Sequence, residues 1–148
     1  MSTPICQNDF RLPEPIQRAG CLFRSLSMLA EIRTGRTLTP AQIVEQYKWL
    51  VRHEYMDANC YVQDHAAVIR AAQYYLEAPQ RASYVLRQTE TGHGDFETDT
   101  PNAWIGHVKT EAGNGHFLVV ARDGRCIWDP WWPSPMPIKS LSLRGYAL

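Results

Sequence analysis

The sequence predicts an α+β protein in which helices come first and an antiparallel sheet follows. In the first half of the chain, apolar residues recur at spacings of three and four, which is the period of an amphipathic helix. From residue 83 onward, short apolar runs rich in β-branched and aromatic residues alternate with Gly- and Asp-containing turns, a pattern typical of strands. A block of helices followed by a block of strands indicates an α+β layout with one antiparallel sheet.

Three helices are expected, over residues 20–34, 39–53 and 64–76. The first ends at a Thr-Gly pair, and glycine favours the left-handed conformation that closes many helices. The second has the clearest start, because Thr39 at the N-cap and Gln42 three residues later form a capping box around a proline at the first helical position. The third follows an Asp that can cap its first turn.

Five strands are expected in the second half. Their ranges are 83–88, 102–110, 116–122, 125–129 and a final short strand within 138–146. Asp123-Gly124 predicts a two-residue hairpin turn between the third and fourth strands. The polar stretch 89–101 contains two glycines and several acids, and we expect it to be a loop.

Length and charge limit the classes of function. The 148 residues suit one domain, 1–148, in which residues 1–19 are expected to form an irregular N-terminal arm because prolines interrupt them. Lys+Arg and Asp+Glu are both 15, so the basic excess typical of nucleic-acid binding is missing. No apolar run approaches the roughly 18 residues of a membrane span, and the N-terminus has no secretory signal. We therefore expect a cytoplasmic protein without a nucleic-acid or membrane partner.

The four cysteines do not indicate a metal site or a disulfide framework. They are Cys6, Cys21, Cys60 and Cys126. No CxxC pair occurs and the five histidines are scattered, so we expect no metal and no cofactor. The absence of an export signal argues against disulfides. Cys60 and Cys126 are expected to be small buried apolar residues.

Cys21 stands where a cysteine nucleophile is favoured, in the first turn of the first predicted helix and directly after Gly20. The free N–H groups and the dipole at a helix start stabilise a thiolate. The same N–H groups can bind the oxyanion that forms when a carbonyl is attacked. Taken alone, however, a cysteine here is more often an apolar residue that opens an amphipathic helix.

A histidine and an acid at matching ends of one hairpin strengthen the case. His116 opens the third predicted strand, and Asp129 ends the fourth. An antiparallel hairpin brings these two ends together, so that the carboxylate can orient the imidazole and stabilise its charged form. We therefore predict a Cys–His–Asp site made of Cys21, His116 and Asp129.

Two segments resemble the papain-like cysteine peptidases, and most closely the bacteriocin-leader-processing peptidases. They are GCLFRSLSMLAE (20–31) and GHFLVVARDGRCIWDPW (115–131). The start of the first segment also resembles small uncharacterised proteins of phages and prophages. The resemblance implies a papain-like domain with Cys21 as nucleophile, His116 as its base or imidazolium partner and Asp129 as the orienting group. Residues 36–100 show no such resemblance.

The sequence departs from that family at the oxyanion donor. The family has a Gln shortly before the Cys, whereas the nearest one here is Gln17, four residues before Cys21. Gln17 is therefore the candidate donor, while Gln7 is too distant in sequence to assign. Trp131 and Trp132 are candidates for contact with a substrate or a partner, because exposed aromatic side chains are common at such surfaces.

The leading hypothesis is a thiol hydrolase that cleaves an amide bond in a peptide or isopeptide, with a peptide or protein as its substrate. The alternative is a phage-encoded, non-catalytic binding protein on an inactivated papain-like scaffold, with a host enzyme or defence system as its target. Hydrolysis of cell-wall amides is a further reading. Acyl transfer uses the same three residues, so the sequence does not separate it from hydrolysis, and it does not indicate an oligomeric state.

Overall fold

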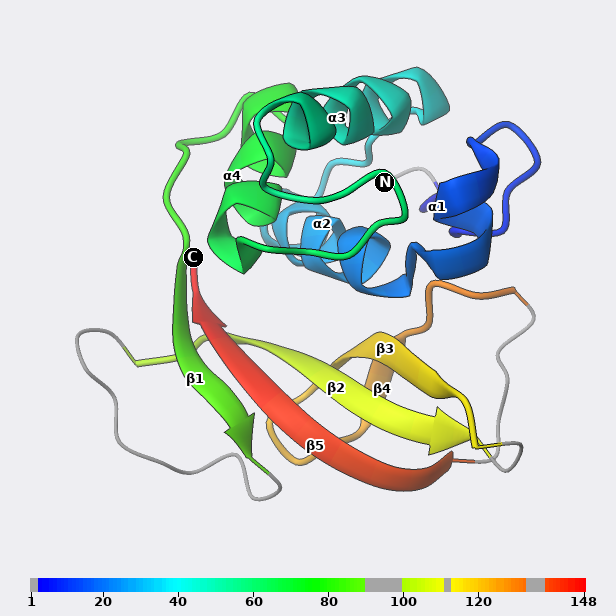
Figure 1. Ribbon diagram of the computed structural model, residues 1–148. Coiled ribbons are helices and arrows are strands. Elements are labelled where there is room, and N and C mark those ends of the chain that lie inside the picture. Colours follow the sequence, from blue (N-terminus) through cyan, green and yellow to red (C-terminus); the bar gives the residue numbers. More distant parts are fainter. Residues whose placement is uncertain (1–2, 90–99, 111–112, 133–137) are drawn as a thin grey trace.

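The computed structural model describes residues 3–89, 100–110, 113–132 and 138–148. Within these ranges the chain forms four helices and one five-stranded antiparallel sheet. The helices lie together on one side and the sheet on the other (Figure 1). The predicted α+β layout is confirmed.

The three predicted helices form within a few residues of their expected bounds. The four helices are α1 (Glu14–Ala19), α2 (Cys21–Thr34), α3 (Pro40–Arg52) and α4 (His65–Tyr75). Thr39 and Gln42 form the expected capping box at the start of α3. Gly35, with φ of 69°, closes α2 in the left-handed conformation. The side chain of Asp64 accepts a hydrogen bond from the N–H of Ala67 and caps α4.

The prediction of an irregular arm over residues 1–19 is wrong for residues 14–19, which form helix α1. Its prolines occupy the N-cap and the first turn, where the missing N–H has no partner within a helix in any case. The helix leads directly into α2 through Gly20. The N–H of Gly20 donates to the carbonyl of Ile16 at 2.8 Å, and its own carbonyl accepts from the N–H of Arg24 at 2.9 Å. Cys21 therefore sits at a tight junction between two helices.

The last strand of the chain lies between the first two strands of the sheet. The strands are β1 (Ser83–Thr89), β2 (Ala103–Thr110), β3 (Gly115–Val120), β4 (Cys126–Trp128) and β5 (Ile138–Ala147), and their spatial order is β1-β5-β2-β3-β4. Most of the predicted loop 89–101 (residues 90–99) lies outside the described residues.

The β3–β4 hairpin has a longer turn than Asp123-Gly124 predicts. The N–H of Ala121 donates to the carbonyl of Arg125 at 2.9 Å, so residues 122–124 form the turn. Gly124 adopts a φ of 89°, a conformation that glycine tolerates without strain. The side chain of Asp123 accepts a hydrogen bond from the N–H of Arg125 and stabilises this wider turn.

Helix α2 is packed between the sheet and the other helices. Its buried face joins a core that also includes Ile105, Val119 and Tyr146 from the sheet. The hydroxyl of Ser25 donates to the carbonyl of Phe117 at 3.3 Å and fixes the first turns of α2 against β3. This packing brings the start of α2 close to the start of β3. None of the helices in the described ranges combines the length and apolar character needed to cross a bilayer.

Candidate active site

Cys21 is the first residue of α2 and is half-buried. The first N–H groups of a helix have no acceptor within it. Among the described residues, no side chain caps this end of α2. The thiol of Cys21 therefore lies beside free backbone donors and at the positive end of the helix dipole.

His116 and Asp129 meet as the hairpin predicts. The Nε2 atom of His116 lies 2.7 Å from Oδ1 of Asp129, and both side chains are largely buried. The same carboxylate oxygen accepts a hydrogen bond from the N–H of Trp131 at 2.9 Å. Asp129 is therefore anchored to the backbone that follows it, and in turn it fixes the orientation of the imidazole.

Cys21 lies close enough to His116 to raise the pKa of its ring, so the structure brings all three predicted residues together. The pKa of His116 is raised from its ordinary value of 6.5 to about 9. Burial is the largest single effect and lowers this pKa. It is outweighed by the hydrogen bonds and negative charges of Asp129 and Cys21, which favour the protonated ring. An imidazolium beside the thiol at neutral pH is the arrangement that activates a cysteine nucleophile.

The structure does not bring Gln17 into this group. Its Nε2 atom donates to the backbone carbonyl of Leu12 at 2.7 Å, which ties α1 to the turn before it. The contacts of Gln17 therefore give no support to the expectation that it supplies the oxyanion donor. That expectation rested on distance along the chain, whereas helix α1 decides where this side chain points.

Gln7, to which the sequence assigned no role, contacts both the segment after Asp129 and the segment before Cys21. Its N–H donates to the carbonyl of Pro130 at 2.7 Å, next to Asp129. Its Nε2 atom lies 3.3 Å from the carbonyl oxygen of Gln17, four residues before Cys21. The side chain is only 2% exposed, and its Oε1 atom has no partner among the described residues. Gln7 thus spans the two segments that carry the acid and the nucleophile, although no local motif marks it.

The other three cysteines are held as thiols. Burial raises the pKa of Cys60 to about 12, with a further contribution from Asp57. Partial shielding of the thiol group from water also raises the pKa of Cys6 and that of Cys126. Cys60 is buried, as predicted. The prediction that Cys126 is buried is wrong, because Cys126 is exposed in β4, a three-residue strand at the edge of the sheet.

Aromatic side chains are exposed next to the His–Asp pair. Trp131 and Trp132 follow Asp129 after a single proline, and Trp132 is 74% exposed. Asn8 holds the backbone of Trp132 with two hydrogen bonds, at 2.6 and 3.1 Å. Phe10, two residues after Asn8 in the chain, is 86% exposed. We refer to Phe10, Trp131 and Trp132 as the aromatic surface.

His107 has the packed position expected of a residue on a sheet face. Its ring stacks on that of Phe117 with centroids 4.5 Å apart. Burial lowers its pKa, and the charge of Arg144 lowers it further. A neutral, stacked imidazole in mid-strand has a packing role, which distinguishes it from His116.

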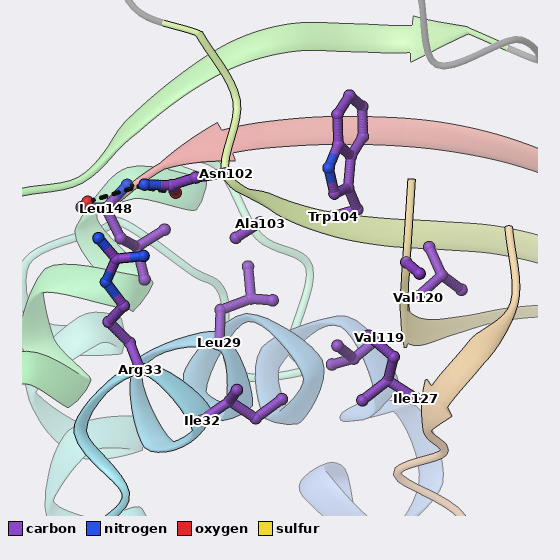
Figure 2. Close-up of a pocket in the computed structure, with 11 residues that line it drawn as sticks. Leu29, Ile32, Arg33, Asn102, Ala103, Trp104, Val119, Val120, Ile127 and Leu148 are labelled. Carbon is purple, nitrogen blue, oxygen red and sulfur yellow. Dashed lines mark hydrogen bonds between the residues drawn. The ribbon is translucent and has the colours of Figure 1, made fainter. Parts of the chain in front are cut away.

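An apolar cavity of about 230 Å³ lies at the other end of α2 from Cys21. Figure 2 shows Leu29 and Ile32 of α2 on one side of it and side chains of β2, β3 and β4 on the other. Arg33 adds a positive charge to its lining. These residues are two to three helical turns beyond Cys21, so the cavity is separate from the Cys–His–Asp group.

A family model matches residues 3–139, and its description reads "Protein of unknown function, DUF261". The chain belongs to this family. The match includes Gln7, Cys21, His116 and Asp129, but the family description assigns no activity to them. No curated protein and no solved structure matches the chain. The function has to be inferred from the geometry of the site.

Proposed function

We propose that this protein is a papain-like thiol hydrolase that cleaves an amide bond in a peptide or isopeptide. The observation that carries the proposal is the His116–Asp129 hydrogen bond at the start of β3, with the thiol of Cys21 beside the same imidazole. A thiol at a helix start, an imidazole at a strand start and an acid that orients it are the parts needed for nucleophilic catalysis by cysteine.

The proposed reaction has two steps. The thiolate of Cys21 attacks the amide carbon, forms a C–S bond and moves the carbonyl electron pair onto oxygen. When this intermediate collapses, the C–N bond breaks and the His116 imidazolium gives its proton to the leaving nitrogen. His116 then takes a proton from water, which attacks the thioester and releases the carboxylic acid and the Cys21 thiolate.

Two donors are available in this proposal for the oxyanion of each intermediate. One is the backbone N–H of Cys21 at the uncapped start of α2. The other is the second N–H of the Gln7 carboxamide, whose Nε2 atom already donates to the carbonyl of Gln17 at 3.3 Å and whose backbone is held beside Asp129 by Pro130. Loss of one such donor lowers the rate by about a hundredfold or more in other hydrolases.

The aromatic surface supports a polypeptide as the substrate. Trp131 is two residues from Asp129, so a chain whose scissile bond lies at Cys21 can place its neighbouring side chains against these rings. Aromatic side chains bury large apolar areas and are common where proteins bind peptides. Transfer of the acyl group to an amine in place of water would use the same residues.

Selective alkylation tests the proposed nucleophile. We expect iodoacetamide at pH 6.5 to modify Cys21 more than about tenfold faster than Cys126, because only the thiolate reacts. Peptide mass spectrometry gives the rate at each cysteine. The variant His116→Ala is expected to lose the fast reaction, whereas His53→Ala, which replaces an exposed histidine at the end of α3, should keep it. Similar rates at Cys21 and Cys126 would contradict the proposal.

The exposed aromatic surface also fits the second candidate function, a binding protein without catalysis. The variant Cys21→Ala separates the two candidates. Loss of amide cleavage in a defined peptide library, with binding retained, supports the hydrolase. If wild-type protein cleaves nothing in the library, and wild type and Cys21→Ala bind the same partner equally, the binding function is supported.

A further inference from the structure

Helix α2 contains a fully buried ion pair close to the nucleophile. The Nη2 atom of Arg24 lies 3.0 Å from Oε2 of Glu31, and both side chains are 0% exposed. Replacing such a pair with apolar residues is often neutral or stabilising, so stability alone is a weak reason for a buried pair. The Nη1 atom of Arg24 has no partner among the described residues. The fold therefore carries a charged group whose role is not explained by packing.

Arg24 uses its other donors to hold the N-terminal segment. Its Nε and Nη2 atoms lie 3.1 and 2.9 Å from the carbonyl oxygen of Ile5. Its guanidinium also lies 5.8 Å from the centroid of the Trp128 ring, in the residue before Asp129. Because residues three apart on a helix are neighbours on its surface, Arg24 makes these contacts one turn from Cys21.

Residues 5–9, which we term the N-terminal strap, are fastened at both ends. Arg24 binds the carbonyl of Ile5 at one end. At the other end, Asn8 binds the backbone of Trp132 with two hydrogen bonds. Gln7 lies between these attachments, with its N–H on the carbonyl of Pro130. The strap forms no helix or strand, and its one internal backbone bond among the described contacts is the turn in which the N–H of Asp9 donates to the carbonyl of Cys6 at 3.2 Å.

We propose that Arg24 is a positioning residue: it fixes the N-terminal strap so that Gln7 completes the oxyanion hole beside Cys21. This inference rests on the proposed hydrolase function and adds to it the residue that holds one oxyanion donor in place. Glu31 holds the guanidinium in place and, through Oε1, accepts the N–H of Leu38 at 2.9 Å.

Two reactions of Cys21 separate the oxyanion hole from the thiolate. With iodoacetamide, the thiolate forms an S–C bond as iodide leaves, and no oxyanion forms. With p-nitrophenyl acetate, the thiolate adds to the carbonyl, the electron pair moves onto oxygen, and p-nitrophenolate then leaves as the C–O bond breaks. The ratio of the acylation rate to the alkylation rate therefore measures stabilisation of the oxyanion.

The test uses the full chain and the double variant Arg24→Met/Glu31→Gln. It removes both charges together, and the new Gln side chain keeps an acceptor for the N–H of Leu38. We expect the acylation rate to fall by about tenfold to a hundredfold, as for Gln7→Ala, while alkylation stays within about twofold. Arg33→Met, which replaces an exposed arginine on the same helix, is the matched control and should change neither rate.

A combined variant distinguishes positioning from a general structural effect. If Arg24 acts through Gln7, adding Gln7→Ala to the double variant lowers acylation little further, because residues that act through one interaction are not additive. Hydrogen exchange at the Gln7 amide gives an independent measurement of the strap. It should become faster in the double variant, since the bond to Pro130 is then made less often.

Specific results overturn the inference. The inference is overturned if the double variant folds and keeps the wild-type ratio of acylation to alkylation. It is also overturned if the effects of the double variant and of Gln7→Ala on the acylation rate are fully additive. If the double variant does not fold, Asn8→Ala loosens the strap from its other end, and an unchanged ratio in that variant also overturns it. Failure of the proposed function is distinct: wild-type Cys21 would then show neither fast alkylation nor acylation, and the inference fails with it.

Discussion

The Nε2 atom of His116 lies 2.7 Å from Oδ1 of Asp129, a contact made between residues at the open end of the β3–β4 hairpin. The same carboxylate oxygen is tied to the N–H of Trp131. The imidazole therefore has one nitrogen fixed by the acid and the other free to face Cys21. Several testable consequences depend on this orientation.

The protonation of His116 depends on both of its partners. We expect its ring to titrate near pH 9 in the wild type, because hydrogen bonds and charges from Asp129 and Cys21 raise the pKa despite the lowering effect of burial. Cys21→Ala and Asp129→Asn should each move the pKa toward 6.5. The Cε1 proton resonance of His116, followed by NMR from pH 5 to 10, measures this. A wild-type pKa near 6.5 would contradict the assignment.

The stability of the fold should depend on this proton. Because the pKa of His116 is higher in the folded than in the unfolded protein, its contribution is fully present below pH 6.5 and is lost as pH rises through about 9. Urea unfolding at pH 6.5 and 9.5 checks the sign. The loss of free energy of unfolding between these values should be smaller in Asp129→Asn, since one source of the raised pKa is then removed.

Orientation and charge at Asp129 can be separated by two substitutions. Asp129→Asn keeps an oxygen that accepts from His116, so we expect amide hydrolysis to fall by no more than about tenfold. Asp129→Ala removes the acceptor and should lower kcat by about a hundredfold or more, because the imidazole is no longer held. Steady-state kinetics on one peptide substrate compare the two. Equal losses would show that orientation is not the main role of Asp129.

Gly20 is required by the close approach of α1 and α2. A Cβ atom there would lie 2.5 Å from the carbonyl oxygen of Ile16 and 2.9 Å from its Cγ2 atom. We expect Gly20→Ala to lower the free energy of unfolding by about 1–3 kcal/mol, since the backbone must shift to relieve the overlap. Denaturant unfolding gives this value. An unchanged midpoint would show that the junction adapts without cost.

Trp132 should contribute to substrate binding and little to stability. Its side chain is 74% exposed, so Trp132→Ala is expected to change the free energy of unfolding by less than about 0.5 kcal/mol. We expect KM for a peptide substrate to rise by about tenfold with kcat unchanged, the effect of losing one aromatic contact. Tyr74→Ala, at an exposed aromatic residue on α4, is the control. An equal effect of both variants would remove the aromatic surface from the proposal.

Local patterns in the sequence were sufficient for most of the secondary structure. The capping box at Thr39 and Gln42, the glycine after α2 and the apolar period of each helix depend on residues a few positions apart, so they are readable before folding. Helix α1 was missed because its prolines were interpreted as breaks, although their place in the first turn allows a helix.

The candidate site divides in the same way. Cys21 is marked by the start of a helix, and His116 and Asp129 by the two ends of one hairpin, so their meeting follows from chain-local geometry once α2 packs on β3. Cys126 shows the limit of this reasoning, because its exposure is decided by the place of β4 at the sheet edge, which the apolar character of its strand does not reveal.

The sequence by itself determined the helix and strand pattern and the Cys–His–Asp candidates. Only the tertiary structure decided which glutamine is hydrogen-bonded to the segments that carry them. Gln17 is nearer to Cys21 in the chain, but helix α1 directs its carboxamide to Leu12. Gln7 is fourteen residues away and is held near the site by Arg24 and Pro130. Contacts between distant segments depend on how whole elements pack. The number of residues between Gln7 and Cys21 therefore does not predict that they come close in the fold.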